Sequence, residues 1–112
     1  MTDPEGLVRR YYEALDDGEY GDLEAILAPE FVQRRPDRSF ESRGEFVGFM
    51  RDGRPNTDTR HELRALEVRA DGECAIARGR LFDAGGTELF AFVDRFTLAE
   101  GRVVRLETEV DG

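Results

Sequence analysis

Hydrophobic positions in the first half of the chain recur every three or four residues, which predicts helices. In the first predicted helix these positions are Leu7, Val8, Tyr11, Tyr12 and Leu15. Thr2 or Asp3 before Pro4 is a helix start signal, and Gly18 ends the repeat. A short second helix is expected up to Pro29, and a third covers about residues 43–51.

The rest of the chain predicts strands. Residues 31–42 form two short extended pieces around a Pro36-Asp37 turn. Beyond residue 60, apolar and polar residues alternate, which predicts four strands over residues 61–70, 73–83, 87–98 and 102–110. The turns between them are Asp71-Gly72, Gly85-Gly86 and Glu100-Gly101. Three helices followed by an antiparallel meander predict an α+β domain in which a curved sheet wraps around the helices and encloses a pocket.

One carboxyl group stands in the apolar face of the strand over residues 87–98. Alternate residues of a strand share a face, so the neighbours of Asp94 are Phe90, Phe92, Phe96 and Leu98. A carboxylate that is buried without a partner is costly, so it stays protonated or finds a donor. Perturbed carboxyls of this kind cluster at functional sites, which makes this strand the candidate location for chemistry.

Several polar side chains allow two interpretations. Asp94 either lines a pocket and donates to a ligand oxygen, or is a carboxylate paired with Arg78 or Arg80 that holds the curvature of the sheet. His61 is the only histidine and either reaches the pocket mouth as an acid or base, or lies on the surface. Glu107 either faces inward from the last strand or is exposed and ion-paired.

Composition narrows the class of protein. A chain of 112 residues with 39% apolar content suits a single domain over residues 1–112. No apolar run approaches the ~20 residues of a membrane span, and the N-terminus lacks the features of a signal peptide, so a cytoplasmic location is expected. A single cysteine, Cys74, excludes an internal disulfide, and a single histidine excludes a histidine-based metal cluster. No metal and no cofactor are expected.

The charge is strongly acidic. All 16 basic residues are arginine, and with 25 acids the net charge is −9. An acidic, lysine-free composition is typical of salt-adapted proteins, such as those of GC-rich halophilic archaea. Nucleic acids and anionic membranes need basic patches, so neither is expected as a partner. The chain contains no glycine-rich phosphate loop and no nucleophile elbow.

Two segments resemble the nuclear transport factor 2-like superfamily, and within it the SnoaL-like and ketosteroid-isomerase-like proteins. The first is VRRYYEALDDGEYGDLEAILAPEF, with its helix, D-x-G-D/E turn and second helix. The second is FVDRFTLAEGRVVRLE, a D-x-F-x-x-x-x-G-K/R-V/I strand–turn–strand. The resemblance covers almost the whole chain. It implies a cone-shaped, strongly bent antiparallel sheet around three N-terminal helices, the cystatin-like roll, with an apolar pocket at its open end and commonly a homodimer through the outer sheet face.

The resemblance also implies site residues. Ketosteroid isomerases use two oxyanion donors and one carboxylate base. The matching donors are Tyr11 in RRYYEAL and Asp94, whose counterpart is a protonated aspartic acid. The position of the base holds Arg35 in QRRPD, and a protonated arginine cannot abstract a proton from carbon. Asp37, two positions on, is the nearest carboxylate that a shifted turn could bring close.

The resulting hypothesis is a small-molecule-binding protein that acts on an apolar carbonyl or hydroxyl compound by isomerisation, cyclisation or hydration. Tyr11 and Asp94 are the candidate catalytic residues. Further pocket candidates are Tyr12, Phe31, Arg35, Phe46, Phe49, Met50, His61, Phe92 and Phe96. Alternatively the phenylalanines fill the core, and Arg35 is solvated rather than bound to an anionic ligand. Adjacent helical positions differ by about 100°, so one of Tyr11 and Tyr12 is expected to reach the pocket, and the sequence alone does not say which.

Two other functions stay open at this point. The first is a non-catalytic, dimeric binding or interaction module, which would need no carboxylate base. An epoxide hydrolase-like site would require Arg80, Asp94 and Glu107 to face inward together around a water molecule.

Overall fold

The first helix begins and ends where the sequence predicts. The computed structural model describes residues 3–53, 59–69 and 72–111. Helix α1 (Pro4–Asp17) is capped by Asp3, whose carboxylate accepts from the backbone N–H of Gly6. It ends at Gly18, whose φ of 69° is a left-handed conformation that favours glycine.

The second and third helices differ in length from the prediction. Helix α2 (Tyr20–Ile26) ends before Pro29, because Leu27 already begins strand β1 (Leu27–Arg34). Pro29 has no N–H to donate, and the pairing of β1 shifts register in this part of the strand. After the short β2 (Ser39–Phe40), helix α3 (Arg43–Gly48) continues as a π-helical turn, η1 (Phe49–Gly53).

Among the described residues, six strands form one sheet in the order β2-β1-β6-β5-β4-β3. The predicted meander consists of β3 (Arg60–Arg69), β4 (Cys74–Phe82), β5 (Glu88–Ala99) and β6 (Arg102–Asp111), which pair antiparallel. The sheet is not antiparallel throughout, since β1 and β6 pair in parallel. The chain passes through β2, α3, η1, β3, β4 and β5 before β6 returns beside β1 in the same direction.

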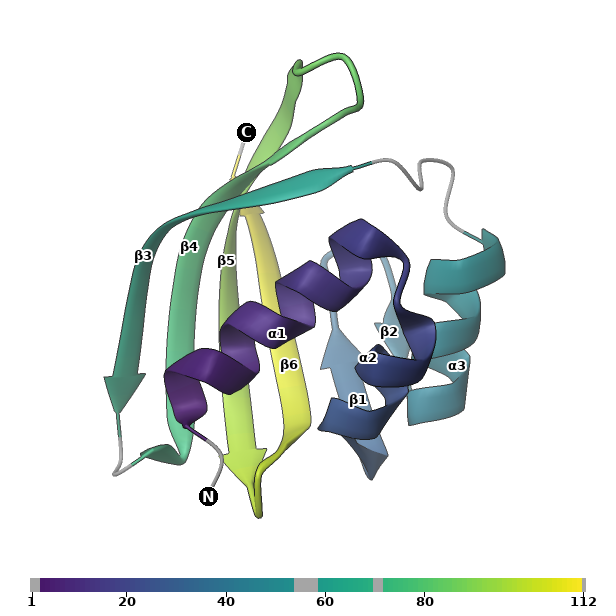
Figure 1. The fold of residues 1–112 in the computed structure, drawn as a ribbon, viewed down its shortest axis with the longest axis vertical. Coiled ribbons are helices and arrows are strands. Elements are labelled where there is room, and N and C mark those ends of the chain that lie inside the picture. Colours follow the sequence, from purple (N-terminus) through teal and green to yellow (C-terminus); the bar gives the residue numbers. More distant parts are fainter. Residues whose placement is uncertain (1–2, 54–58, 70–71, 112) are drawn as a thin grey trace.

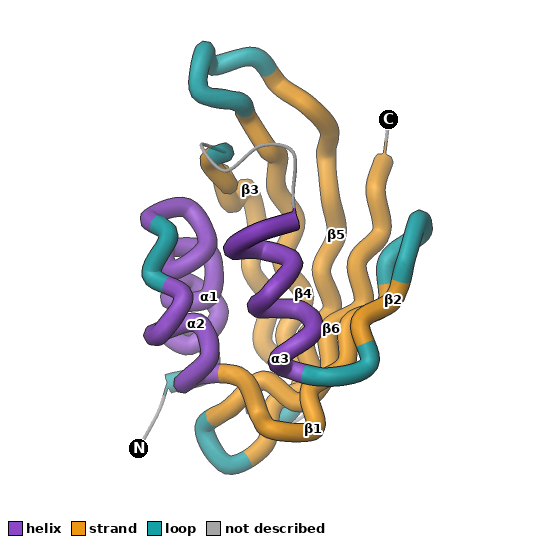
Figure 2. Tube along the Cα trace, turned by 90° about the vertical axis from the view of Figure 1, so that its right-hand side faces the viewer, coloured by secondary structure: helices purple, strands orange, loops and turns teal. Residues whose placement is uncertain are grey.

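The helices lie on one face of the curved sheet. Figure 1 shows α1 across the concave face and α2 and α3 next to β1, while β3 passes above α1. Figure 2 shows all three helices on one side of the strands. Two layers around a shared core confirm the predicted α+β roll.

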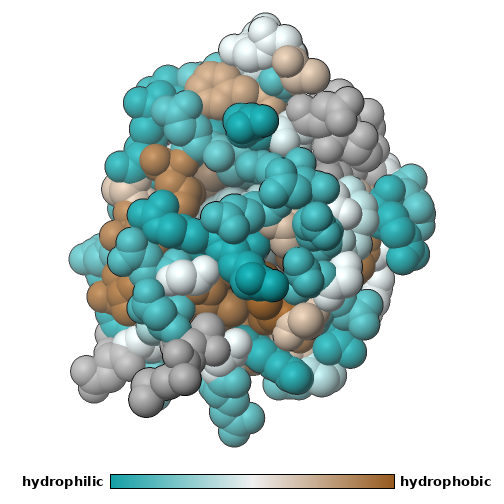
Figure 3. All heavy atoms as spheres, viewed as in Figure 1, coloured by the Kyte–Doolittle hydropathy of each residue, from teal (hydrophilic) through white to brown (hydrophobic). Residues whose placement is uncertain are grey.

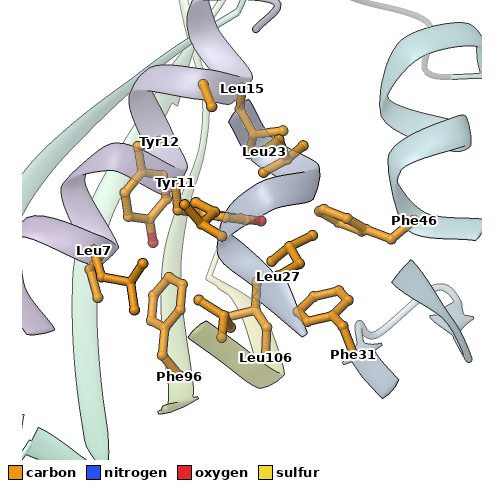
Figure 4. Packing of buried hydrophobic residues seen from close by; sticks show 14 of the residues in the cluster. Leu7, Tyr11, Tyr12, Leu15, Leu23, Leu27, Phe31, Phe46, Phe96 and Leu106 are labelled. Carbon is orange, nitrogen blue, oxygen red and sulfur yellow. The ribbon is translucent and has the colours of Figure 1, made fainter. Parts of the chain in front are cut away.

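The buried core joins the helices to the concave face of the sheet. Its largest fully buried side chains are Phe31, Phe46, Phe96, Leu23, Leu27 and Leu106. Figure 4 shows them converging from α2, α3 and the strands onto the underside of α1. The core therefore fills the space between the helices and this part of the concave face.

Hairpin turns connect the meander strands. Glu100 and Gly101 both have positive φ, 54° and 75°, as a two-residue type I′ turn requires. Gly86 has a φ of 85° in the preceding hairpin. The predicted Asp71-Gly72 turn falls partly outside the described residues, because only Gly72 is described.

The surface is mainly charged. Figure 3 shows hydrophilic side chains over most of the face that carries the helices, with hydrophobic atoms visible between them. Exposed arginine–glutamate pairs such as Arg95–Glu109 recur along the strands, and each stabilises the fold little. None of the described helices combines the length and hydropathy needed to cross a membrane.

Candidate functional site

A cavity of about 310 Å³ opens between the helices and the concave face of the sheet. Its apolar wall consists of Tyr11, Leu15, Phe49, Met50, Leu81, Leu89, Phe90 and Phe92. Its polar wall consists of Gln33, Arg35, Asp37, Arg38, Thr59, His61, Asp94 and Thr108. An apolar hollow with a few converging polar groups is the usual form of a small-molecule site.

Asp94 is the buried carboxyl group of this cavity, with a relative exposure of 5%. The Tyr12 hydroxyl donates to Asp94 Oδ2 at 2.5 Å, and the Thr108 hydroxyl donates to Oδ1 at 2.6 Å. Both distances are in the range of charge-assisted O–H···O bonds. Helix α1 and strand β6 therefore hold the two oxygens of Asp94 from opposite sides.

Gln33 extends this network through Thr108. The amide Nε2 of Gln33 donates to Thr108 Oγ1 at 3.0 Å. The single proton of the threonine hydroxyl goes to Asp94, so Thr108 can only accept from Gln33. The network thus runs in one direction, from Gln33 to Thr108 to Asp94.

Burial raises the pKa of Asp94 above its ordinary value of 3.8. The hydrogen bonds from Thr108 and Tyr12, and the charges of His61 and Arg35, oppose this shift without cancelling it. Burial also raises the pKa of Tyr12, and the neighbouring Asp94 charge adds to the effect, so Tyr12 keeps its proton. Asp94 therefore holds a proton more readily than an exposed aspartate and can donate it at the cavity wall.

His61 lies close to this network and is held by Asp16. His61 Nδ1 is 2.6 Å from Asp16 Oδ1, and the backbone N–H of His61 donates to Oδ2 at 2.9 Å. The side chains of His61 and Asp16 are 14% and 17% exposed. The imidazole packs at 5.0 Å from the Tyr12 ring and 5.6 Å from the Phe92 ring.

The turn after β1 brings further charges to the cavity. Arg35 is 22% exposed in its side chain, and its Nε lies 3.6 Å from Asp37 Oδ1. The guanidinium of Arg38 lies 4.5 Å from the centre of the Phe49 ring, a cation–π contact. Arg35 thus belongs to the cavity wall, and Asp37, which was expected to reach the site only by a shifted turn, also lines it.

The structure brings most of the predicted site residues together. The cavity wall includes Tyr11, Arg35, Phe49, Met50, His61, Phe92 and Asp94. Phe31, Phe46 and Phe96 are fully buried in the core instead, as the alternative interpretation has it. Tyr12 contacts Asp94, and Figure 4 shows the hydroxyls of Tyr11 and Tyr12 pointing in different directions.

The suggested ion pair of Asp94 with Arg78 or Arg80 is wrong. Asp94 lies opposite Ala77 in the sheet register, so the side chain of the next residue, Arg78, points to the other face. Arg80 is exposed and pairs with Glu88 at 2.6 Å.

The epoxide hydrolase arrangement does not form either. Glu107 pairs with Arg105 at 3.0 Å, while its neighbour Thr108 lies opposite Asp94. Arg80, Asp94 and Glu107 therefore do not share a face of the sheet, as that site would require.

The residues of the site that sequence reasoning missed include Gln33, Thr108 and Asp16. A signal existed for the first two. Gln33 follows the buried Phe31 by two positions, and Thr108 follows the buried Leu106 by two, so each pair shares a strand face. No local signal marks Asp16 as the partner of His61, because 45 residues separate them.

The described part of the chain contains no cluster of side chains of the kind that binds a metal ion. Within residues 3–53, 59–69 and 72–111, no three histidine, cysteine, aspartate or glutamate side chains gather closely enough to hold an ion.

Comparison with known proteins identifies a family. The family model described as SnoaL-like domain matches residues 8–106. No curated protein matches the chain.

Solved structures support the same fold. An NTF2-like protein of unknown function from Cytophaga hutchinsonii has a TM-score of 0.84 at 14% identity, covering 99% of this chain and 92% of its own. A candidate ketosteroid isomerase from Kribbella flavida has a TM-score of 0.83 at 21% identity, covering 97% and 78%. A candidate SnoaL-like polyketide cyclase from Jannaschia has a TM-score of 0.80 at 18% identity, covering 96% and 85%. At these identities the likeness shows the fold alone.

Proposed function

Because the chain belongs to the SnoaL-like family, we propose that its cavity binds a small apolar molecule through a carbonyl or hydroxyl oxygen. The reaction that fits this site is an isomerisation or cyclisation that passes through an enol or enolate. Structural neighbours that carry the names ketosteroid isomerase and polyketide cyclase support this choice of reaction class.

The observation that carries the proposal is the position of Asp94. It is a buried carboxyl at the wall of the cavity, and its pKa is raised by burial. A protonated carboxyl can donate a hydrogen bond to a ligand oxygen and stabilise the negative charge that develops there. Tyr12 and Thr108 fix its orientation before the ligand arrives.

Tyr11 is the second donor in this proposal. It also lines the cavity, from the same helix that supplies Tyr12. Its ring packs between the rings of Phe46 and Phe96, at 6.3 and 5.3 Å, which restricts its motion. A donor on a rigid helix is better placed than one on a loop to meet an oxygen held by Asp94.

The proposal is tested with a simple β,γ-unsaturated ketone, 3-cyclohexen-1-one, whose isomerisation to the conjugated enone is followed by ultraviolet absorbance. Asp94→Asn should slow the reaction, and Asp94→Leu should abolish it, since loss of one oxyanion donor costs roughly 10²-fold or more. Asp52→Asn is the matched control, because Asp52 is exposed in η1 and does not line this cavity. Equal rates for the wild type and both Asp94 variants would rule out this role.

A second candidate is a non-catalytic binding module, favoured by Arg35 at the position where the related isomerases carry their base. In this case a hydrophobic ketone should raise the melting temperature with increasing concentration. No turnover should accompany the binding. A ligand-independent melting temperature for every ketone tried would argue against both candidates.

We infer that the protein forms a homodimer through the outer face of the sheet. In Figure 2, none of the described helices lies on that face. Ile76 and Val93 share it with Arg78 and Arg95, according to the strand register. Light scattering after size exclusion should give twice the chain mass, and Val93→Glu should give a monomer. A monomeric wild type would contradict this inference.

We also infer a salt-adapted cytoplasm as the setting, supported by a net charge of −9 and a complete absence of lysine. The same charge favours a small molecule over nucleic acid or an anionic membrane as the partner. A melting temperature that rises with potassium chloride concentration is the expected result, because salt screens the repulsion between acids.

A further inference from the structure

A second polar group borders the cavity at the start of β3. His61 lines the cavity, and Asp16, in the last turn of α1, accepts hydrogen bonds from both the ring and the backbone of His61. The contact joins two elements that are 45 residues apart in the chain. Because the ring also packs against Tyr12 and Phe92, its orientation is fixed on three sides.

The Asp16 contact determines which nitrogen of the ring is available. A carboxylate only accepts, so Nδ1 of His61 carries a proton directed at Asp16. In the neutral ring, Nε2 then holds the free lone pair. Within the described parts of the chain, Nε2 has no hydrogen-bonding partner. His61 thus presents an oriented, unoccupied base in a cavity wall.

Asp16 occupies an unfavourable place in its helix. The last turn of α1 carries Asp16 and Asp17 and no basic residue. Acids at a helix C-terminus are disfavoured by the helix dipole. A residue that is unfavourable for its own helix is expected mainly at functional sites. Here the unfavourable acid, Asp16, holds His61.

We propose that His61 is the general base of the cavity and that Asp16 positions it. The substrate class is a ketone with a removable hydrogen on the carbon beside the carbonyl group, and its oxygen is bound by Asp94. This inference rests on the proposed function for the oxygen site. It supplies the base that Arg35 cannot provide.

The step balances without a further reactant. Nε2 of His61 takes the proton of the α carbon, and the C–H bond breaks. Its electron pair forms the carbon–carbon double bond of an enolate, while the carbonyl electrons move to the oxygen that Asp94 holds. Asp16 stabilises the imidazolium formed in this way. Return of the proton from Nε2 to the γ carbon of a β,γ-unsaturated ketone gives the conjugated isomer, with no net oxidation or reduction.

The alternative is that the Asp16–His61 contact only fastens α1 to β3. One variant separates the two roles. In His61→Asn, the side-chain amide can occupy the position of Nδ1 and donate to Asp16, but no group replaces Nε2. A purely structural contact predicts that this variant keeps its melting temperature and its activity.

Two probes are used with the full chain. The first is 5-nitrobenzisoxazole, in which removal of one carbon-bound proton opens the ring to a coloured nitrophenolate without a ketone. The second is 3-cyclohexen-1-one. We expect His61→Asn to keep the wild-type melting temperature and lose roughly 10²-fold or more in rate with both probes. We expect Asp94→Leu to lose the ketone reaction.

A rescue experiment distinguishes a base from a structural role. Added imidazole should restore proton removal in His61→Gly and should not do so in Asp16→Asn, where the histidine ring still fills its place. Asp16→Asn should lower kcat and leave KM nearly unchanged. Wild-type rates for His61→Asn with both probes would overturn the proposal and leave the role of Asp94 standing. A different outcome separates the two sites. If the wild type opens nitrobenzisoxazole but does not isomerise the ketone, and His61→Asn loses the nitrobenzisoxazole reaction, then His61 is the base and Asp94 does not bind a ketone oxygen.

Discussion

Tyr12 Oη and Asp94 Oδ2 lie 2.5 Å apart, although 82 residues separate them in the chain. The bond links the helix that crosses the sheet to the strand at the cavity wall. It is buried, so water does not compete for either partner. The position of α1 and the protonation of Asp94 are therefore coupled through one hydroxyl group.

Tyr12→Phe should destabilise the fold and raise the pKa of Asp94 further. The tyrosine bond lowers that pKa, and its loss leaves a buried carboxyl with one donor fewer. We expect a cost of about 1–3 kcal/mol in the free energy of unfolding, measured by urea denaturation. Tyr11→Phe is the control, since it leaves both hydrogen bonds of Asp94 in place. Equal shifts of the Asp94 pKa in the two variants would contradict this assignment.

Thr108 should tolerate serine and reject valine. Valine has nearly the same shape but leaves the Gln33 amide without its acceptor and Asp94 without its second donor. The expected loss in unfolding free energy is about 1–3 kcal/mol for Thr108→Val, again from urea denaturation. Thr108→Ser retains the hydroxyl and should keep the Asp94 pKa close to that of the wild type. An unchanged free energy of unfolding in Thr108→Val would show that the network contributes nothing to the stability of the fold.

The raised pKa of Asp94 predicts a specific pH dependence of stability. A carboxyl with a higher pKa in the folded state binds its proton more tightly there, so its contribution is fully present below the unfolded pKa of ~3.9. The contribution is lost as the pH rises through the folded pKa. The melting temperature of Asp94→Asn, minus that of the wild type, should therefore increase with pH across this window. A difference that falls with pH would mean that the folded pKa is depressed.

Gly79 should not accept a side chain. An added Cβ would lie 2.3 Å from the Glu62 carbonyl oxygen and 2.9 Å from Cζ of Phe92, which lines the cavity. Gly79→Ala should cost about 1–3 kcal/mol or more and should weaken binding of any cavity ligand, as judged by calorimetric melting with and without the ligand. Gly44→Ala, in α3 with open space around the position, is the control and should be neutral or slightly stabilising. A Gly79→Ala variant as stable as the control would be inconsistent with this packing.

Much of the fold was predictable because local chemistry and global packing agree in this chain. Asp3, Pro4 and Gly18 mark the ends of α1, and these signals act within a few residues of the helix they delimit. The parallel pairing of β1 with β6 was not predictable in the same way. It depends on where the chain returns after the four strands β2 to β5, and Pro29 in β1 suggested a helix end instead.

The sequence predicted the burial of Asp94, but not which residues hydrogen-bond to it. Alternation alone placed Asp94 on the buried face of β5, and the structure confirms this burial. The hydrogen-bonding partners of Asp94 depend on how the neighbouring side chains are oriented, which the pattern of apolar and polar residues does not give. Tyr11 and Tyr12 are both buried, so either could have been the donor. Thr108 rather than Glu107 faces Asp94, as alternation from the buried Leu106 predicts, but alternation does not show that its hydroxyl reaches the carboxyl group.

Asp94 acts in this cavity as a desolvated acid at the wall. The measurement that checks this role is the pKa of Asp94, obtained by carboxyl-selective carbon NMR over a pH titration, with Asp94→Asn to assign the resonance. The structure predicts a pKa above the ~3.9 of a free aspartate, because burial outweighs the bonds from Tyr12 and Thr108. A pKa at or below that value would mean an ionised carboxylate held by its two donors, and would contradict a role as hydrogen-bond donor to a ligand oxygen.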